Sequence, residues 1–148
     1  MDLVKGIKER RSIRKFQDKP IDRKLIEEIV ETARFAPSWK NTQIVRYLVV
    51  DDKEKIAAIA NSKCTYGFDY NIKAIAGAPA VVILTFVEGR SGFDKDGSFS
   101  TPKGEGWQMF DAGIAAQTFC LAAHEKGLGT VIQGYFDDAE LKKVLPIP

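Results

Sequence analysis

The segment from Trp107 to Lys126 constrains the fold of this chain more than any other. Its spacing predicts the longest helix of the protein, and apolar residues occupy much of the circumference of that helix. A helix that is apolar nearly all round is either buried or packs on a partner as well as on its own domain. Gly127 follows at the position of a C-terminal cap, which places the end of the helix.

Three segments are predicted to be strands. Residues Ala80 to Val87 form an almost unbroken apolar run, which is typical of a central strand buried on both faces. Ile44 to Val50 is β-branched and aromatic, and Thr130 to Gln133 reads as a short buried strand. The sheet is therefore expected to be small.

Shorter helices surround these strands in the sequence. Apolar periodicity and acidic N-cap residues predict them after Asp2, from Arg23 to Ala33, from Lys53 to Ala60, from Ile72 to Ala76, and after Asp137. Residues 88–106 are rich in Gly, Ser, Asp and Lys, which predicts a long exposed loop of the kind that often forms a lid. Helices dominate, so we predict an α+β fold with a small sheet covered by helices.

Length and charge limit the class of protein. A chain of 148 residues is most simply one domain, so we predict a single domain over residues 1–148. The net charge of +2 argues against a general attraction to nucleic acid or to a membrane surface. The longest apolar stretch, 74–87, contains Gly77 and Pro79 and is too short to span a bilayer.

The cysteine and histidine content argues against a metal centre. Cys64 and Cys120 have neither metal nor redox spacing, and His124 is the single histidine of the chain. A buried Cys120 in a reducing compartment fits this usage better than a secreted disulfide scaffold. We therefore predict a cytoplasmic protein without a metal site.

A basic cluster near the N-terminus is the first candidate binding segment. Residues 10–15 combine four basic side chains with the hydroxyl of Ser12. The planar fork of a guanidinium donates parallel hydrogen bonds that match a phosphate. The alternative is a solvated helix end, where cations favour the helix dipole.

A polar turn is the second candidate segment. Pro37-Ser38-Trp39-Lys40-Asn41 exposes short polar groups that can bond the edge of a planar heterocycle. Ser38 and Asn41 could instead be simple turn formers. Taken together, the basic cluster and this turn predict a phosphorylated ligand that carries a ring.

Three motifs, in this order along the chain, resemble those of the nitroreductase family, whose members are FMN-dependent oxidoreductases. They are Arg-Arg-Ser-Ile-Arg-Lys-Phe at 10–16, Ala-Pro-Ser-x-x-Asn-x-Gln at 36–43, and Gly-Leu-Gly-Thr at 127–130. The resemblance implies a three-layer α/β/α fold with a small, mostly antiparallel central sheet. It also implies a homodimer with an FMN site at each interface, where the long apolar helix forms much of the contact.

The resemblance also implies which residues bind FMN. The expected contacts to the phosphate and the ribityl chain are Arg10, Arg11, Ser12 and Arg14; those along the flavin, from the other subunit, are Pro37, Ser38, Trp39 and Asn41; and those at the isoalloxazine edge are Asn71, Gln133 and Gly134. Asn71 could instead cap a helix, and Gly134 could be a turn at a strand end. Trp39 could shield the flavin or pack at the dimer interface.

Two departures from the family pattern affect the expected site. Family members usually continue into a further strand and a segment that carries a basic residue for the FMN phosphate, and this sequence stops before both. Phosphate affinity is therefore expected to rest on Arg10 and Arg14, with help from Arg11. Some members also place a lysine close to the flavin where this chain has Ala74, so that cation is missing here.

The implied chemistry belongs to the flavin, and no catalytic side chain is required. Hydride passes from NAD(P)H through flavin N5 to a nitroaromatic, quinone or flavin acceptor in a ping-pong cycle. The sequence does not distinguish NADH from NADPH. It has no Gly-x-Gly-x-x-Gly fingerprint, as expected if the nicotinamide simply stacks on the flavin. Candidate elements of the acceptor pocket are Tyr66, Tyr70, Phe110 and residues 88–106.

Two alternatives remain at this point. One is a flavin-binding protein without turnover, for storage or sensing. The other is a specialised family chemistry, such as reductive dehalogenation or flavin fragmentation.

Overall fold

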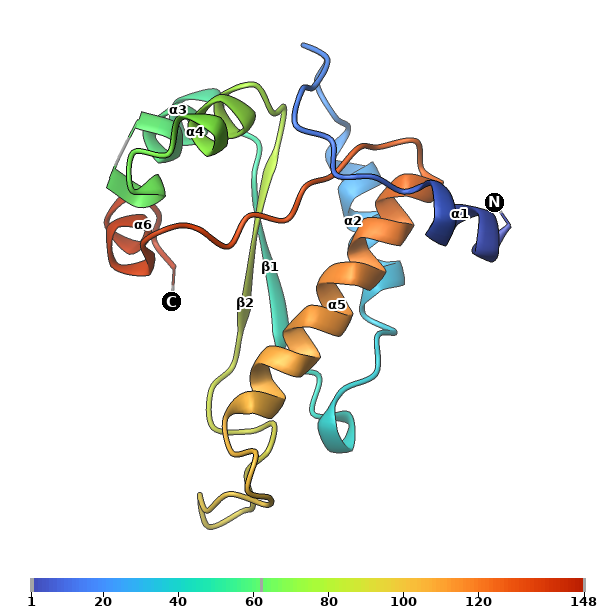
Figure 1. Cartoon of the computed structure of the whole chain (residues 1–148), viewed down its shortest axis with the longest axis vertical. Coiled ribbons are helices and arrows are strands. Elements are labelled where there is room, and N and C mark those ends of the chain that lie inside the picture. The colour runs from blue at the N-terminus through green and yellow to red at the C-terminus, as the bar shows by residue number, and fades with distance from the viewer. Residues whose placement is uncertain (1, 62, 148) are drawn as a thin grey trace. The chain divides into compact units, whose positions relative to one another are not determined.

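A computed structural model describes residues 2–61 and 63–147 and shows six α-helices with one small sheet (Figure 1). The helices are α1 (Leu3–Glu9), α2 (Arg23–Ala33), α3 (Lys53–Asn61), α4 (Asp69–Ala76), α5 (Gly106–Glu125) and α6 (Asp138–Val144), and the strands are β1 (Val45–Val50) and β2 (Val81–Phe86). Short 3₁₀ turns, η1 (Trp39–Asn41) and η2 (Lys63–Thr65), precede β1 and α4. The predicted α+β class is confirmed.

The helix boundaries follow the capping residues in the sequence. The carboxylates of Asp2, Asp52 and Asp137 each accept a hydrogen bond from a backbone amide in the first turn of the helix that follows. At the end of α5, Gly127 adopts φ +77°, a left-handed conformation that glycine takes without steric cost. The predicted starts of α1, α3 and α6 and the predicted end of α5 are therefore confirmed.

The chain divides into two compact units. The first consists of residues 2–10, 23–48 and 83–128, and the second of the described residues in 11–22, 49–82 and 129–147. Both strands contribute residues to each unit. The amide of Val87 donates to the carbonyl of Ile44 at 2.9 Å, so the end of β2 meets the start of β1 and the pair is antiparallel.

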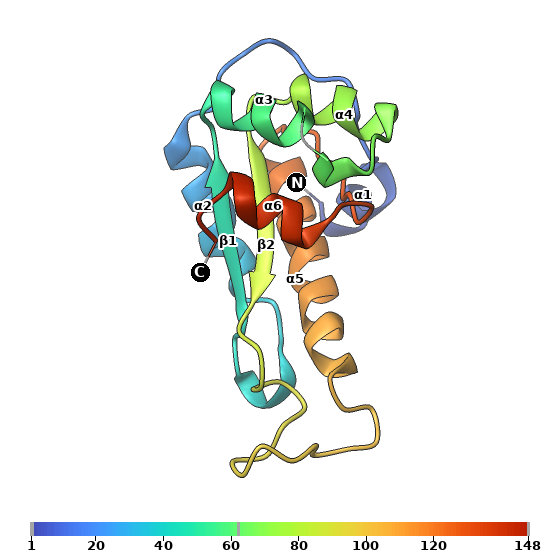
Figure 2. The same cartoon turned by 90° about the vertical axis from the view of Figure 1, so that its left-hand side faces the viewer.

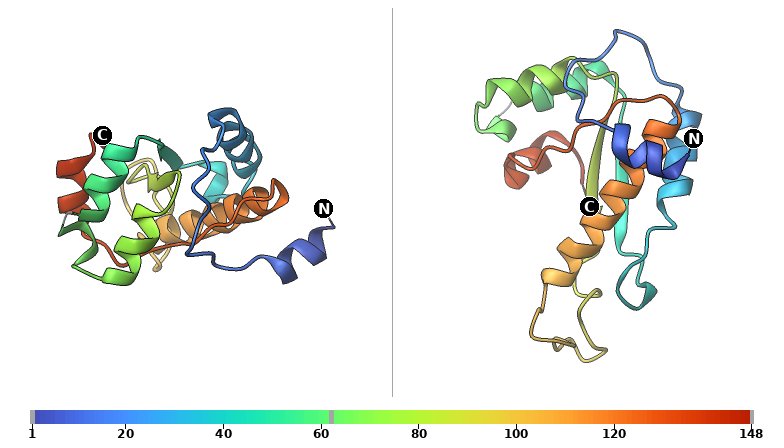
Figure 3. Two further views of the ribbon diagram at one scale, coloured as in Figure 1. Left: turned by 90° about the horizontal axis from the view of Figure 1, so that it is seen from above. Right: turned by 45° about the vertical axis from the view of Figure 1, so that its right-hand side comes forward.

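In the first unit, α2 packs along α5 (Figures 1 and 3). Helix α2 buries Ile26, Ile29 and Ala33, and α5 buries Ala112 and Ala115 among its core residues. Helix α1 contacts α5 as well, yet its apolar residues Leu3, Val4 and Ile7 remain exposed. The apolar face of α1 is thus not used in the core of this chain.

In the second unit, α3 packs against α4, and α6 packs against η2 and α3 (Figure 2). The buried side chains here include the apolar or thiol groups Ile56, Ile59, Cys64, Ala74, Leu141 and Leu145. The amide of Asp137 donates to the carbonyl of Cys64 at 2.6 Å and joins the start of α6 to η2. The predicted burial of Cys120, in the first unit, is also confirmed.

The strand predictions need two corrections. Every residue of β2 is only half-buried, so the prediction of a strand buried on both faces is wrong; in residues 2–61 and 63–147 the sheet has two strands, and β2 is paired along one edge. The predicted strand from Thr130 to Gln133 is also wrong. Within the described residues of this segment only Thr130 forms a β-bridge, with Ser12, and Ile132 is exposed.

Two further boundaries differ from the sequence prediction. Helix α4 starts at Asp69, ahead of the predicted Ile72, because Phe68 supplies the extended residue at its N-cap. Residues 88–106 are not simply exposed: Ser91 is fully buried, and Phe93 pairs with Phe99 in an antiparallel bridge.

Across the described part of the chain, no helix has the length and apolar character needed to cross a membrane.

Candidate functional site

The basic segment is held by the stretch of chain that follows α5. Ser12 forms a parallel bridge with Thr130, and the Ile13 amide donates to the Thr130 carbonyl at 2.9 Å. The guanidinium of Arg14 lies 5.8 Å from the ring centre of Tyr70 and donates to the Ser12 carbonyl at 3.3 Å. A guanidinium held over a ring in this way still has N–H groups that can donate hydrogen bonds to an anion.

Close approach of these two segments requires glycine at position 129. A Cβ atom there would lie 2.9 Å from Cβ and Cγ1 of Ile13, which is closer than such atoms can approach without a shift. Gly129 therefore sets the distance between the basic segment and the residues that lead to Gln133.

We expect Gly129→Ala to lower the free energy of unfolding by about 1–3 kcal/mol, the usual cost of an added methyl group that forces its neighbours to shift. It should also weaken the bond between Ile13 and Thr130. Urea denaturation and hydrogen exchange at the Ile13 amide measure the two effects. Gly106→Ala is the matched control, since a Cβ there meets nothing within 4 Å. Equal stability of Gly129→Ala and wild type would contradict the close approach.

Asn71 is brought next to the 133–135 segment. Its side chain is 9% exposed, and its Nδ2 atom donates to the carbonyl of Tyr135 at 3.4 Å. Phe68, and not Asn71, is the N-cap of α4, so the alternative role of Asn71 as a helix cap is wrong. Because no strand precedes Gly134, its alternative role at a strand end is wrong too.

Four exposed aromatic rings form a cluster in the same unit. The ring centres of Tyr66 and Tyr135 are 5.1 Å apart, those of Phe68 and Tyr135 are 5.8 Å apart, and those of Phe68 and Tyr70 are 6.3 Å apart. All four side chains are about half exposed. A contiguous exposed aromatic surface is typical of a ligand or partner contact. Phe68 and Tyr135 were missed from the sequence, because nothing in the spacing of 66–70 brings residue 135 close.

The phenol of Tyr66 has a perturbed environment. Reduced hydration raises its pKa, and the nearby carboxylates of Asp137 and Asp138 raise it further. Because its pKa is raised, the hydroxyl remains a neutral hydrogen-bond donor over the whole physiological pH range. The backbone of Tyr66 adopts φ 49°, which is uncommon for a residue with a bulky side chain.

The polar turn, residues 37–43, lies in the first unit and has an unusual backbone. Lys40, Asn41 and Gln43 have φ values of 44°, 55° and 48°, in the left-handed region that non-glycine residues rarely enter. Each such residue costs about 1–2 kcal/mol, so surrounding contacts must hold the turn. Within the turn, Ser38 Oγ accepts from the Gln43 amide at 2.9 Å.

Helix α5 supplies two of those surrounding contacts. The amide of Trp39 donates to both carboxylate oxygens of Asp111, at 3.1 Å each, and the ring centre of Trp39 lies 4.4 Å from that of Trp107. A cavity of about 240 Å³ beside the turn is lined by Pro37, Ser38 and Asp111, among others. Asp111 was missed from the sequence, although a lone carboxylate inside an otherwise apolar helix is a detectable signal.

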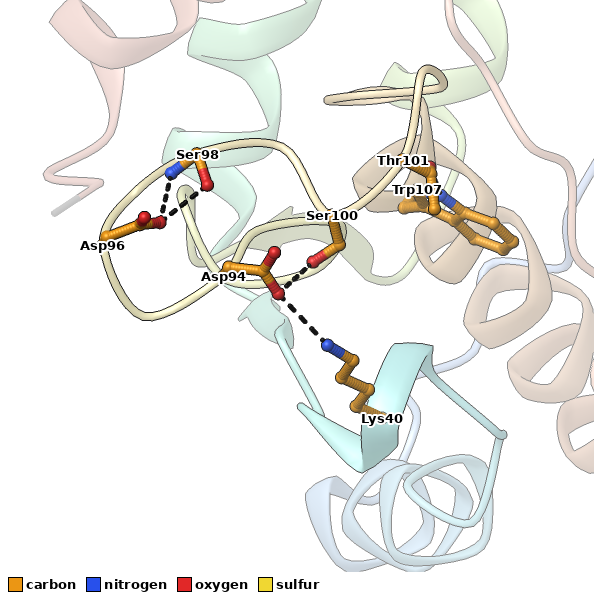
Figure 4. A network of polar contacts seen from close by, with 7 residues as sticks. All are labelled: Lys40, Asp94, Asp96, Ser98, Ser100, Thr101 and Trp107. Atoms are coloured by element: carbon orange, nitrogen blue, oxygen red, sulfur yellow. Dashed lines mark hydrogen bonds and ion pairs between the residues drawn. The ribbon is translucent and has the colours of Figure 1, made fainter.

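A third contact joins the turn to residues 88–106 (Figure 4). Lys40 Nζ lies 3.3 Å from Oδ1 of Asp94, and the Ser100 hydroxyl donates to the same oxygen at 2.6 Å. Further along, Trp107 Nε1 donates to Thr101 Oγ1 at 2.9 Å. These bonds give the 88–106 segment a defined conformation next to the turn.

Comparison with known proteins identifies the family. The model of the nitroreductase family matches residues 7–65 and 68–148. The chain belongs to the nitroreductase family. The predicted nitroreductase-like fold is confirmed as well: a nitroreductase family protein from Clostridium novyi NT superimposes with a TM-score of 0.82 at 28% identity, over 100% of this chain and 78% of that one.

Two further relatives have names that mention FMN. The chain is 30% identical to the FMN reductase [NAD(P)H] of Bacillus subtilis, over 99% of this chain and 60% of that protein. It is also 30% identical to the FMN-dependent nitroreductase of Clostridium difficile R20291, with a TM-score of 0.67, over 96% of this chain and 75% of that one. The chain spans 62% and 60% of the length of two of the curated relatives it matches, about three fifths of each.

The predicted site residues of this nitroreductase-family chain fall into two groups. The second unit holds six of them: Arg11, Ser12, Arg14, Asn71, Gln133 and Gly134. The first unit holds the other five: Arg10, which is the C-cap residue of α1, and Pro37, Ser38, Trp39 and Asn41 of the turn. Their assignment to FMN stays a prediction.

A pH titration tests the contact between the turn and the 88–106 segment. The Ser100 hydroxyl, followed by the Lys40 ammonium, lowers the pKa of Asp94 below its ordinary value. Because the folded pKa is the lower one, this contact stabilises the fold above the unfolded pKa and is lost as the pH falls through the folded value. We expect both Ser100→Ala and Lys40→Met to raise the pKa of Asp94, as measured by carboxyl ¹³C NMR. Ser98→Ala is the control, since Ser98 bonds Asp96 instead. An ordinary pKa for Asp94 in the wild type would refute the contact.

Proposed function

We propose that the protein is an FMN-dependent oxidoreductase that uses NAD(P)H to reduce a nitroaromatic, quinone or flavin acceptor. One observation carries the proposal. A single compact unit contains the guanidinium groups of Arg11 and Arg14, which can donate hydrogen bonds to a phosphate, the side-chain amide of Asn71, and a cluster of exposed aromatic rings. Relatives named FMN reductase [NAD(P)H] and FMN-dependent nitroreductase support it.

The residues present fit FMN by their chemistry. Arg11, Ser12 and Arg14 are all exposed, and they combine guanidinium and hydroxyl donors of the kind that bind a phosphate ester. Asn71 uses its Nδ2 atom on Tyr135, which leaves its amide oxygen to accept from a ring N–H. Gln133 and Gly134 follow the bridge at Thr130 without forming a strand, so their backbone amides are not committed to a sheet.

Bound FMN would supply the redox chemistry, taking hydride from NAD(P)H and passing it to the acceptor in a ping-pong cycle. In this proposal the side chains bind, orient and shield. Arg11 and Arg14 hold the phosphate, and Asn71 orients the ring edge. The aromatic cluster offers faces on which a flat acceptor can stack, and the neutral phenol of Tyr66 can donate a hydrogen bond to an acceptor oxygen.

We infer in addition that the chain acts as a homodimer in which the 37–43 turn borders the flavin of the partner subunit. Two exposed apolar surfaces support this: Leu3, Val4 and Ile7 on α1, and Met109 and Phe110 on α5. Large exposed apolar groups on neighbouring helices are typical of a surface that another chain covers.

The test is an anaerobic spectrum of the purified protein with FMN, before and after NADH or NADPH is added. A flavin band that bleaches with either donor and recovers with a nitroaromatic or a quinone supports the oxidoreductase. A bound flavin that neither donor bleaches supports the alternative of a flavin-binding protein without turnover. Failure to retain FMN after reconstitution would refute both.

A further inference from the structure

We propose that Asp111 is the positioning residue for the 37–43 turn: its buried carboxylate fixes the Trp39 amide and thereby keeps Ser38 and Asn41 in the conformation that meets a flavin. This inference rests on the proposed function, in which that turn borders FMN. Neither the predicted flavin contacts nor the family motifs include Asp111.

The first argument is the burial of Asp111. Its side chain is 2% exposed, and both of its oxygens accept from the Trp39 amide at 3.1 Å. Among residues 2–61 and 63–147 no Lys, Arg or His side chain forms an ion pair with it. A carboxyl group in such a place depends on the donors it has, so its bond to Trp39 is strongly favoured over leaving the group unpaired.

The second argument is the weakness of the other polar contacts of the turn. Lys40 pairs with Asp94 at the surface, where both side chains are at least 49% exposed, and Arg46 donates to the Gln43 carbonyl at another exposed position. Exposed contacts of this kind contribute little to stability. Two buried atoms of the turn, Trp39 Nε1 and Thr42 Oγ1, have no hydrogen-bond partner within the described ranges. Asp111 thus supplies a buried carboxylate from outside the turn that bonds to its backbone, in addition to the bond within the turn from the Gln43 amide to Ser38 Oγ.

The third argument is the geometry of α5. Trp107 and Asp111 are four residues apart, so they lie on one face of the helix, one turn above the other. The Trp107 ring contacts the Trp39 ring at 4.4 Å, and Asp111 binds the Trp39 amide. One helix therefore contacts both the ring and the backbone amide of Trp39.

The experiment compares Asp111→Ala, Asp111→Asn and the control Gln108→Ala. Gln108 lies on the same helix, is 5% exposed, and accepts a backbone amide in the same manner, but that amide is Gly89 and not a turn residue. The two readouts are the near-UV circular dichroism of the closely packed Trp39–Trp107 pair without FMN, and the FMN dissociation constant from flavin fluorescence. Thermal melting establishes that each variant is folded.

We expect Asp111→Ala to lose most of the paired-indole signal and to bind FMN about tenfold more weakly, because the partly buried Trp39 amide loses its acceptor. Asp111→Asn keeps an acceptor oxygen and should restore most of both readouts. Gln108→Ala should leave both near wild type.

Unchanged circular dichroism in a folded Asp111→Ala variant, or an equal loss in Gln108→Ala, overturns the assignment. Loss of the signal with unchanged FMN affinity overturns the link to the flavin. If the wild type binds no FMN, the proposed function fails, while the circular dichroism still decides whether Asp111 holds the turn.

Discussion

Arg14→Ala is expected to weaken FMN binding about 10- to 150-fold. A hydrogen bond between a guanidinium and a phosphate is charge-assisted and contributes about 1.5–3 kcal/mol, which corresponds to this range in the dissociation constant. Arg14 is exposed, and its contacts to Tyr70 and to the Ser12 carbonyl orient it without consuming all of its five donors. Equilibrium titration of FMN into apoprotein, followed by flavin fluorescence, measures the change.

Arg34→Ala is the matched control for Arg14→Ala. Arg34 is also an exposed arginine, and its guanidinium lies 5.9 Å from the ring centre of Phe35, much as that of Arg14 lies over Tyr70. Removing Arg34 changes the net charge by the same amount, so any long-range effect of charge should appear in both variants. Only the Arg14 variant should lose the direct phosphate contact.

Arg14→Lys separates charge from geometry. A lysine keeps the positive charge but not the planar fork that bonds two phosphate oxygens together, so intermediate affinity is expected. The phosphate assignment is contradicted if Arg14→Ala and Arg34→Ala bind FMN equally well. Riboflavin, which lacks the phosphate, should bind wild type and Arg14→Ala with similar affinity.

The parts of the fold that could be predicted from the sequence are those set by local rules. The bounds of α2 and the starts of α1, α3 and α6 depend on side-chain caps and on apolar spacing within a few residues. The long helix α5 was predicted to within a residue at each end, because Gly127 ends it. Such features need no knowledge of the rest of the chain.

The parts that could not be predicted depend on contacts between distant residues. Whether an apolar run such as 81–86 becomes a central strand or one edge of a pair is decided by how many strands lie beside it. The segment 130–133 has the composition of a strand, but Ser12 pairs with Thr130 alone and the chain then leaves that partner. Apolar composition alone does not contain this information.

The candidate site shows the same division. Motif spacing identified the basic segment and the turn, since both are continuous in sequence. The roles of Asp111 and Tyr135 arise only when the chain folds, because Asp111 meets Trp39 across 72 positions and Tyr135 meets Asn71 across 64. A side chain that supports a site from a distant element has no sequence motif around it. The sequence shows only a polar or aromatic residue at a position where an apolar or small one would be expected.

Ile29→Ala is expected to lower the free energy of unfolding by about 2–5 kcal/mol, the usual range for truncating a buried Ile to Ala. Ile29 is 1% exposed on the face of α2 that packs along α5, and it is among the largest fully buried side chains. The loss has two parts, the transfer of the side chain from water and the cavity that remains. The cavity part depends on how far α2 can move toward the rigid helix α5. Urea denaturation at one fixed protein concentration, without FMN, measures the change.

Two further substitutions make the Ile29 result interpretable. Ile29→Val removes a single methylene and should cost about 0.5–1.5 kcal/mol, so the effect should grow with the volume removed. Ile132→Ala makes the same chemical change at a side chain that is 62% exposed, and it should alter stability by less than about 0.5 kcal/mol. Equal losses at positions 29 and 132 would mean that the α2–α5 contact is not part of the cooperative core. A large loss confined to position 29 would instead show that the α2–α5 contact is part of the cooperative core.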